Sequence, residues 1–221
     1  MIYLDNAATT ALSPAAIQAM TKTMTVFGNP SSTHSHGREA SKLLRQARED
    51  IAQALHTQSN KILFTSGGTE SNNTAIKGYA LRHQNRGKHI VTTAIEHHAV
   101  LEVVEYLVDK FGFEATFVQP VDGQIRAADI KKALRPDTIL VSVMAVNNET
   151  GAMLPIKEIG ELLHEHPAVF HVDAVQAIGK LPIYPDELGI DFLSASAHKF
   201  HGPKGVGFLY AKKMDFDNFM H

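Results

Sequence analysis

The chain has 221 residues, 44% of them hydrophobic and 20% charged, which is the composition of an ordinary globular protein with one large domain. The formal net charge of −2 at pH 7 shows no basic excess, so we do not expect a nucleic-acid partner. Cysteine is absent, which excludes disulfides, thiolate metal ligands and a cysteine nucleophile within these residues, and we expect no metal site.

Hydropathy and the N-terminal residues bear on location. No apolar run approaches the length of a membrane span. The first residues, Met-Ile-Tyr-Leu-Asp-Asn, lack the basic and then apolar pattern of a secretory signal. We therefore expect a cytoplasmic protein with no membrane partner.

Helical spacing predicts two helices in the first quarter of the chain. Ser13 and Pro14 form the N-cap and first position of a helix that continues to about residue 26. Apolar residues recur at helical spacing over residues 38–55, after a polar loop at residues 28–32. We expect residues 1–12 to form an N-terminal arm and residues 13–221 to form the large domain.

From residue 62 onward, short apolar strands alternate with helices. One predicted helix ends near residue 83, and the others cover residues 100–111, 127–134 and 155–164. The predicted strands cover residues 62–65, 89–93, 114–118, 138–144, 169–173, 191–194 and 206–210. This alternation predicts βαβ units, and hence an α/β three-layer sandwich with a mostly parallel central sheet.

Polar residues collect where these strands end. In an open parallel sheet, ligands bind at the carboxyl ends of the strands. The strand-end groups are Gly67-Gly68-Thr69, Glu96-His97, Asn147-Asn148, Asp173 and Ser196. We therefore predict a composite active site along this edge of the sheet.

Lys199 stands between His198 and a Gly-Pro turn, just before the last predicted strand. A lysine in an enclosed site loses its proton more easily and can then condense with a carbonyl, either of a substrate or of pyridoxal phosphate. Ser196 and His198 offer hydrogen-bond donors that suit a phosphate. A solvated lysine in a surface turn is the alternative that the local sequence leaves open.

Three other motifs have a functional and a purely structural interpretation. The glycines before Thr69 follow a strand and open a helix, which favours an anion but is also typical of a plain strand-to-helix turn. Asp173 can keep a pyridine nitrogen protonated or cap a helix. His97 can stack on a flat ring and move protons, whereas Asn148 lies in a segment with the composition of a polar turn.

Seven blocks of sequence, taken in order, resemble the cysteine desulfurases, which are pyridoxal-phosphate enzymes of aminotransferase class V with fold type I. The resemblance covers nearly the whole chain, and the ordered series is far more specific than any one block. The blocks are Tyr-Leu-Asp-Asn-Ala-Ala-Thr-Thr, Gly-Asn-Pro-Ser-Ser, Thr-Ser-Gly-Gly-Thr-Glu-Ser-Asn-Asn, Glu-His-His-Ala-Val, Asn-Asn-Glu-Thr-Gly, His-Val-Asp-Ala-Val-Gln and Ser-Ala-His-Lys-Phe-His-Gly-Pro-Lys-Gly.

The resemblance implies a role for each strand-end residue. Lys199 would be the Schiff-base lysine and later the base that moves the substrate α-proton, while His97 would stack on the ring and assist proton transfer. Asp173 would pair with the pyridinium nitrogen, and Gln176 with the ring hydroxyl. The phosphate would be held by Gly68, Thr69, Ser196 and His198. Asn148 would contact the substrate carboxylate or the ring hydroxyl, and Asn6 would line the mouth of the substrate site.

The resemblance also implies a cofactor, a substrate and partners. The cofactor would be pyridoxal 5'-phosphate, and L-cysteine would be converted to L-alanine while an enzyme cysteine takes the sulfur as a persulfide. Sulfur would then pass to an acceptor, such as a scaffold protein for iron–sulfur clusters, or to tRNA thiolation. Fold type I proteins usually form homodimers, and residues 28–36 would contact the neighbouring subunit.

This sequence departs from the family pattern in one respect. Family members carry the nucleophilic cysteine and a carboxylate-binding arginine on a small C-terminal domain, which we expect this chain to lack. It would then hold the cofactor without forming a persulfide on itself. The alternatives are another class V aminotransferase or lyase, a cofactor-binding fragment that acts by dimerisation or with a partner chain, and a structural module without a cofactor.

Overall fold

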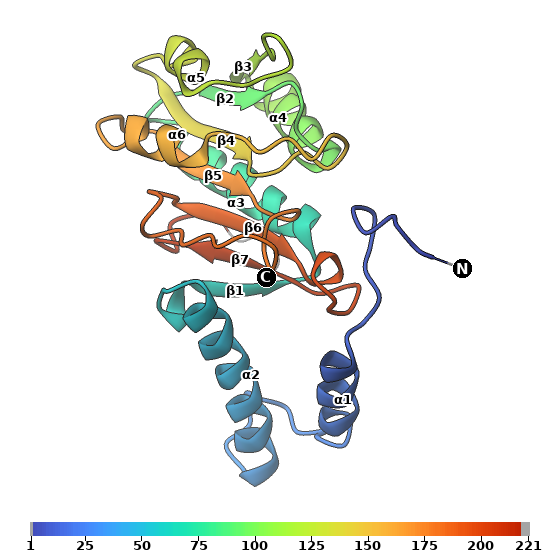
Figure 1. Ribbon diagram of the computed structural model, residues 1–221. Helices are drawn as coiled ribbons and strands as arrows, with labels where there is room; N and C mark the ends of the chain where they lie inside the picture. Colours follow the sequence, from blue (N-terminus) through green and yellow to red (C-terminus); the bar gives the residue numbers. More distant parts are fainter. Residues whose placement is uncertain (1, 218–221) are drawn as a thin grey trace.

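The computed structural model describes residues 2–217 as an α/β body from which two helices extend (Figure 1). The central sheet has seven strands in the order β1-β7-β6-β5-β4-β2-β3. Strand β7 is antiparallel to β1 and β6, and the other neighbouring pairs are parallel. The strands are β1 Ile62–Thr65, β2 His89–Thr93, β3 Glu114–Val118, β4 Thr138–Met144, β5 Val169–Asp173, β6 Phe192–Ser196 and β7 Gly207–Ala211. The predicted α/β class and mostly parallel sheet are confirmed.

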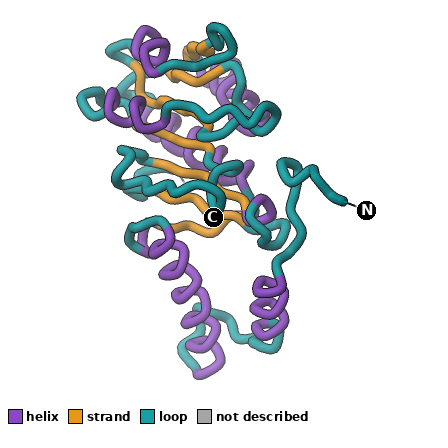
Figure 2. The backbone as a smooth tube through the Cα atoms, viewed as in Figure 1, coloured by secondary structure: helices purple, strands orange, loops and turns teal. Residues whose placement is uncertain are grey.

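Helices cover both faces of this sheet (Figure 2). Helices α3 and α4 share one hydrophobic cluster with the sheet, whereas α5, α6 and the end of α2 contribute to a second cluster. The helices within the described residues are α1 Pro14–Thr23, α2 Ser35–Ala54, α3 Gly68–His83, α4 His98–Phe111, α5 Ala127–Ala133 and α6 Ile156–Leu163, with short 3-10 turns at η1 Ser59–Lys61 and η2 Ala197–Lys199. No helix among residues 2–217 has both the length and the apolar character to cross a membrane.

The pleat of the strands divides the core between the two faces. Ile90 belongs to the cluster under α3 and α4, and its neighbour Val91 belongs to the cluster under α5 and α6. Leu209 and Tyr210 divide in the same way, because successive side chains of a strand point to opposite faces. Every residue of β4 is buried, as its continuous apolar pattern predicts for a strand covered on both sides.

Several element boundaries differ from the sequence prediction by one to three residues. Helix α2 begins three residues early, because the His34 side chain accepts a hydrogen bond from the Gly37 N–H and caps the helix. Helix α1 ends at Thr23 rather than near residue 26. Strand β6 continues to Ser196, which pairs with Gly207 of β7, so the strand ends two residues later than predicted.

Helices α1 and α2 extend past the β1 edge of the sheet, away from the rest of the body (Figure 1). Helix α1 buries none of its residues. Met24 is 76% exposed and Phe27, in the loop that follows, is 82% exposed. Apolar side chains that face solvent together are typical of an interaction surface.

The division into an arm at residues 1–12 and a domain at residues 13–221 stays a prediction. Met1 and residues 218–221 lie outside the described residues. Within them, the arm is bonded to the segment after β6: the Thr10 N–H donates to the His198 carbonyl over 2.8 Å, and the Ser13 N–H donates to the His201 carbonyl over 3.0 Å.

A buried histidine connects three strands beneath the carboxyl edge of the sheet. His171 of β5 is hydrogen-bonded through Nδ1 to the Ser142 hydroxyl of β4 over 2.8 Å, and through Nε2 to the Ser194 hydroxyl of β6 over 3.0 Å. All three residues are fully buried, and burial lowers the pKa of His171 to about 3. The neutral imidazole therefore aligns three strands two residues before Met144, Asp173 and Ser196.

Replacing His171 tests whether its hydrogen bonds stabilise the contact between β4, β5 and β6. His171→Leu should leave two buried hydroxyls without a partner and lower the stability at pH 7 by about 1–3 kcal/mol per hydroxyl. The ordinary pKa of 6.5 falls to about 3 in the folded state, so the wild type should lose stability as the pH drops from 6.5 toward 3. Urea unfolding across this pH range should show a weaker pH dependence in the variant.

His164 offers a matched control because it is exposed at the end of α6. His164→Leu should leave both the stability and its acid dependence close to those of the wild type. Adding Ser142→Ala and Ser194→Ala to His171→Leu should recover part of the lost stability. An equal acid slope in the wild type and His171→Leu would show that His171 does not remain neutral in the fold.

Candidate active site

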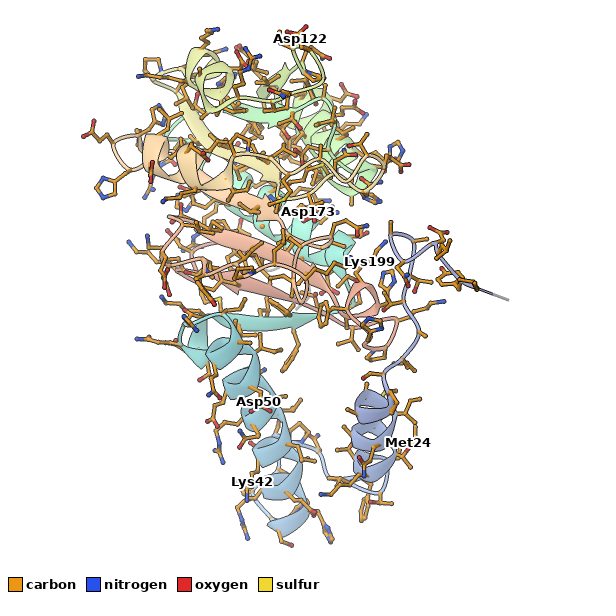
Figure 3. All side chains as sticks on the ribbon, in the orientation of Figure 1. Met24, Lys42, Asp50, Asp122, Asp173 and Lys199 are labelled. Atoms are coloured by element: carbon orange, nitrogen blue, oxygen red, sulfur yellow. The ribbon has the colours of Figure 1, made fainter. Side chains whose placement is uncertain are left out.

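A cavity of about 780 Å³ opens where the strands of the sheet end. Figure 3 shows Asp173 at the end of β5 and Lys199 close to the N-terminal arm. Asn6 is exposed and does not line the cavity, although Asp5, Ala7 and Ala8 do. All the other predicted site residues line it, namely Gly68, Thr69, His97, Asn148, Asp173, Gln176, Ser196, His198 and Lys199.

The reversed direction of β7 brings two parts of the site together. Because β7 is antiparallel, its first residue lies at the edge where β1 and β6 end, and Gly207 pairs with both Thr65 and Ser196. A Cβ atom at Gly207 would lie 2.6 Å from the Gly67 Cα atom and 2.5 Å from the Ala195 carbonyl oxygen. Only glycine permits this approach, which sets the glycine-containing loop beside Ser196.

The loop at Gly67 and Gly68 leads into α3 with open backbone N–H groups. Gly67 caps the helix without a side-chain hydrogen bond, so the N–H groups of the first turn are available to a ligand in the cavity. The Ser66 N–H already donates to a Glu70 carboxylate oxygen over 2.6 Å. A Cβ atom at Gly68 would approach Val175 to 2.6 Å. The loop therefore suits a compact anion such as a phosphate.

Asp173 is a buried carboxyl group at the floor of the cavity. Its Oδ1 atom accepts from the Val175 N–H over 3.0 Å, and its Oδ2 atom accepts from the Asn72 amide over 2.8 Å. Burial raises the pKa of Asp173, while these two bonds and the charges of His97 and Lys199 oppose the rise. The carboxylate can therefore pair with a protonated ring nitrogen that enters the cavity.

Asn72 has a role that the sequence analysis did not assign. It lies in the first turns of α3, is 1% exposed, and its Oδ1 atom is buried without a hydrogen-bond partner among the described residues. A buried amide with one unsatisfied atom at a cavity wall is typical of a residue that meets a ligand. The available signal was its position in the polar block that follows the two glycines.

Lys199 ends the turn η2, and its amine points at the N-terminal arm. The amine donates to the carbonyl oxygen of Ala7 and, over 2.9 Å, to that of Ala8. Burial lowers the pKa of Lys199, the charge of Lys180 lowers it further, and Asp173 and Asp5 oppose the shift. The neutral, nucleophilic amine is thus more populated than in a free lysine.

Gln176 and Lys180 extend this group of contacts. The Gln176 amide donates to the same Ala7 carbonyl over 2.8 Å, and the Lys180 amine donates to the Gln176 side-chain oxygen over 3.3 Å. The sequence analysis missed the arm carbonyls and Lys180, because both join the site through tertiary contacts. Lys180 is exposed, so solvent and salt screen its influence on Lys199.

Both site histidines are hydrogen-bonded through Nδ1. His97 caps α4, where its Nδ1 atom accepts from the Ala99 N–H over 3.1 Å. The Nδ1 atom of His198 is hydrogen-bonded to the Thr9 hydroxyl over 3.1 Å. Burial and the charges of Lys199 and Lys204 lower the pKa of His198. Asn148, the remaining predicted residue, donates to Glu149 over 2.6 Å.

The site thus combines a lysine and a buried aspartate with a glycine loop of open backbone amides, at one edge of a mostly parallel sheet. The sequence matches the aminotransferase class-V family over residues 2–220. The chain belongs to this family.

Within the family, the chain is similar to cysteine desulfurases. It is 53% identical to cysteine desulfurase IscS of Dictyoglomus turgidum, covering 96% of this chain and 54% of the relative, and 52% identical to putative cysteine desulfurase IscS 1 of Bacillus subtilis, covering 96% and 56%. The chain spans about half the length of these curated relatives.

Solved structures agree with the sequence relatives. A structure of SspA in complex with cysteine has a TM-score of 0.95 at 38% identity and covers 100% of this chain and 65% of that chain. A NifS-like protein has a TM-score of 0.94 at 40% identity, with coverage of 100% and 61%. The fold of the described residues is thus the fold of a part of these longer proteins.

The contact between Gly207 and Gly67 predicts the effect of one added methyl group. Gly207→Ala should lower the stability by about 1–3 kcal/mol through overpacking and displace the loop at residues 66–69. Hydrogen exchange should show faster exchange of the amides in this loop. Gly160→Ala is a control far from the site, because its Cβ atom would lie 1.9 Å from the Leu188 carbonyl oxygen. Gly160→Ala should destabilise the chain without a selective effect on the loop, and equal loop exchange in the two variants would contradict the prediction.

Proposed function

We propose that this chain is the cofactor-binding large domain of a pyridoxal 5'-phosphate-dependent cysteine desulfurase that acts on L-cysteine. The observation that carries the proposal is the convergence of Lys199, Asp173 and the glycine loop on one cavity. The similarity to proteins named cysteine desulfurase, at 53% and 52% identity, supports the choice of substrate.

The residues of the cavity fit this cofactor. The open amides of the loop and first turn of α3, with Ser196 and His198, would hold its phosphate. Asp173 would accept a hydrogen bond from its protonated ring nitrogen, and the buried, unpartnered Oδ1 atom of Asn72 lies on the side chain that supports Asp173. When bound, pyridoxal phosphate supplies an aldehyde and an electron sink for the electrons of the amino acid.

The chain contributes positioning and proton transfer to this chemistry. The amine of Lys199 would hold the aldehyde and, once free of it, act as the base at the substrate α-carbon. Asp173 would keep the proton on the ring nitrogen, which makes the ring a stronger electron sink. His97 would stack on the ring and assist proton transfer, while Gln176 and Asn148 would contact the ring hydroxyl and the substrate.

The sulfur-accepting thiol must come from outside these 221 residues, because they contain no cysteine. We propose that a further part of a longer chain or a partner chain supplies it, and that the sulfur passes on to an acceptor or an iron–sulfur scaffold protein. The exposed apolar residues of α1 and the loop after it support a second proposal, that this surface, with residues 28–36, is covered in a homodimer. The cytoplasmic location stays a prediction.

Cofactor capture by Lys199 is open to a direct test. Adding pyridoxal phosphate to the chain should produce a visible absorbance band that resists dialysis, because the amine joins the aldehyde covalently. Lys199→Ala should lose this band, whereas Lys204→Ala, which removes another lysine that lines the cavity, should keep it. The same band in Lys199→Ala, or its loss only in Lys204→Ala, would remove Lys199 from this role.

The charge of Lys180 should influence the pH at which Lys199 begins to capture pyridoxal phosphate. Because the charge of Lys180 lowers the pKa of Lys199, Lys180→Ala should raise that pKa and move the midpoint of capture to higher pH. Added salt should move the wild-type midpoint the same way, since it screens an exposed charge, and should affect the variant less. Lys180→Arg keeps the charge and should resemble the wild type. A midpoint that is unchanged or lower in Lys180→Ala would contradict this prediction.

A further inference from the structure

Two carboxyl groups, those of Asp173 and Glu96, are buried at the carboxyl edge of the sheet, and the charge of Asp173 acts on Glu96. Glu96 directly precedes His97 and is 6% exposed. We propose that Glu96 is a positioning residue that holds a proton at neutral pH, so that of these two groups Asp173 alone carries the negative charge. The relevance to catalysis rests on the proposed function, but the protonation of Glu96 does not require the cofactor.

Glu96 makes two hydrogen bonds, and only one of its two oxygens takes part in them. Its Oε1 atom accepts both of them, from the Thr93 hydroxyl over 2.6 Å and from the Met144 N–H over 3.0 Å. Its Oε2 atom is buried without a hydrogen-bond partner, and no cationic side chain among residues 2–217 forms an ion pair with Glu96. An ionised carboxylate in that setting would be an uncompensated buried charge, which is far more costly than a neutral acid.

Asp173 has the opposite surroundings. Each of its oxygens accepts one hydrogen bond, and the positive charge of Lys199 and the charged form of His97 favour its ionised form. Glu96 faces Thr93 at the end of β2, the backbone of β4, and the negative charge of Asp173 on β5. Two interacting acids titrate as a pair, and the one without a neighbouring cation holds its proton more tightly.

The titration of Glu96 agrees with this geometry. Burial raises the pKa of Glu96 from its ordinary 4.5 to about 8, the bonds from Thr93 and Met144 oppose the rise, and the charge of Asp173 adds to it. An acid of this kind is protonated at neutral pH and ionises only as the pH approaches 8.

Glu96 positions the loop that carries His97. Its bond to the Met144 N–H ties this loop to the carboxyl end of β4, and the Asn147 amide adds a second tie by donating to the Ile95 carbonyl over 2.9 Å. The next residue, His97, lines the cavity and caps α4. A neutral Glu96 therefore fixes His97 without placing a second negative charge beside Asp173, where it would compete for the ring-nitrogen proton.

Infrared spectroscopy of the cofactor-free chain tests the protonation directly. With 13C-labelled glutamate, the wild type at pH 7 should show the carbonyl band of a protonated glutamic acid, and this band should disappear as the pH passes about 8. The band should be absent in Glu96→Gln and present in Glu102→Gln, a control on the exposed side of α4. A wild type without the band at pH 7, or an unchanged band in Glu96→Gln, would overturn the proposal.

Unfolding experiments give a second readout. Because the folded state binds the Glu96 proton more tightly, the wild type should lose stability as the pH rises from 4.5 toward 8. Relative to Glu96→Gln, its unfolding constant should rise by up to roughly tenfold per pH unit in this range. Equal slopes in the two proteins would contradict the proposal. If Glu96→Gln does not fold, the wild-type infrared titration decides alone.

The outcome is separable from that of the proposed function. Both measurements use the chain without cofactor, so they stand even if the wild type fails to capture pyridoxal phosphate. If capture succeeds and the infrared band is absent, the cofactor assignment survives and the role of Glu96 is lost. A positioning role also predicts that Glu96→Gln, which keeps the neutral shape, captures the cofactor like the wild type, whereas Glu96→Ala captures it at least several-fold more weakly.

Discussion

The burial of the Asp173 carboxylate at the end of β5 is the constraint on which the rest of the site depends. A buried carboxylate is unstable unless other groups compensate for the water that it loses. Here the Asn72 amide of α3, the Val175 N–H and the charge of Lys199 do so. Helix α3 must therefore pack closely on the sheet, because Asn72 in its first turns has to reach Asp173.

The sheet supplies the precision that these contacts require. Strands β4, β5 and β6 are linked through the hydroxyls of Ser142 and Ser194 and the neutral ring of His171, directly beneath the row that ends in Asp173 and Ser196. The antiparallel β7 then inserts a residue without a side chain, Gly207, between the ends of β1 and β6. The glycine loop and Ser196 are therefore neighbours because of β7, a strand that contributes no functional side chain.

Charges within the site are arranged so that each group has a different proton affinity. Lys199 is shifted toward its neutral form by burial and Lys180, and His198 toward its neutral form by burial and the neighbouring lysines. Burial raises the pKa of both Asp173 and Glu96, but the charge of Lys199 opposes the rise at Asp173, whereas the charge of Asp173 adds to it at Glu96. This separation is what general acid–base chemistry on a bound cofactor needs, because each proton then has one defined position.

The sequence by itself determined the α/β class, the strands and helices to within a few residues, and nine of the residues that line the cavity. Strand-end polar residues and helical periodicity are local signals, and a parallel sheet brings its carboxyl ends to one edge. Only the tertiary structure decided that β7 is antiparallel, that the carbonyls of Ala7 and Ala8 contact Lys199, that Asn72 and Lys180 join the hydrogen bonds around the site, and that Glu96 is bonded to β4. Asn6, predicted at the substrate mouth, lies outside the cavity lining while its neighbours line it. These features depend on which distant segments touch, and neither residue type nor spacing along a chain specifies that.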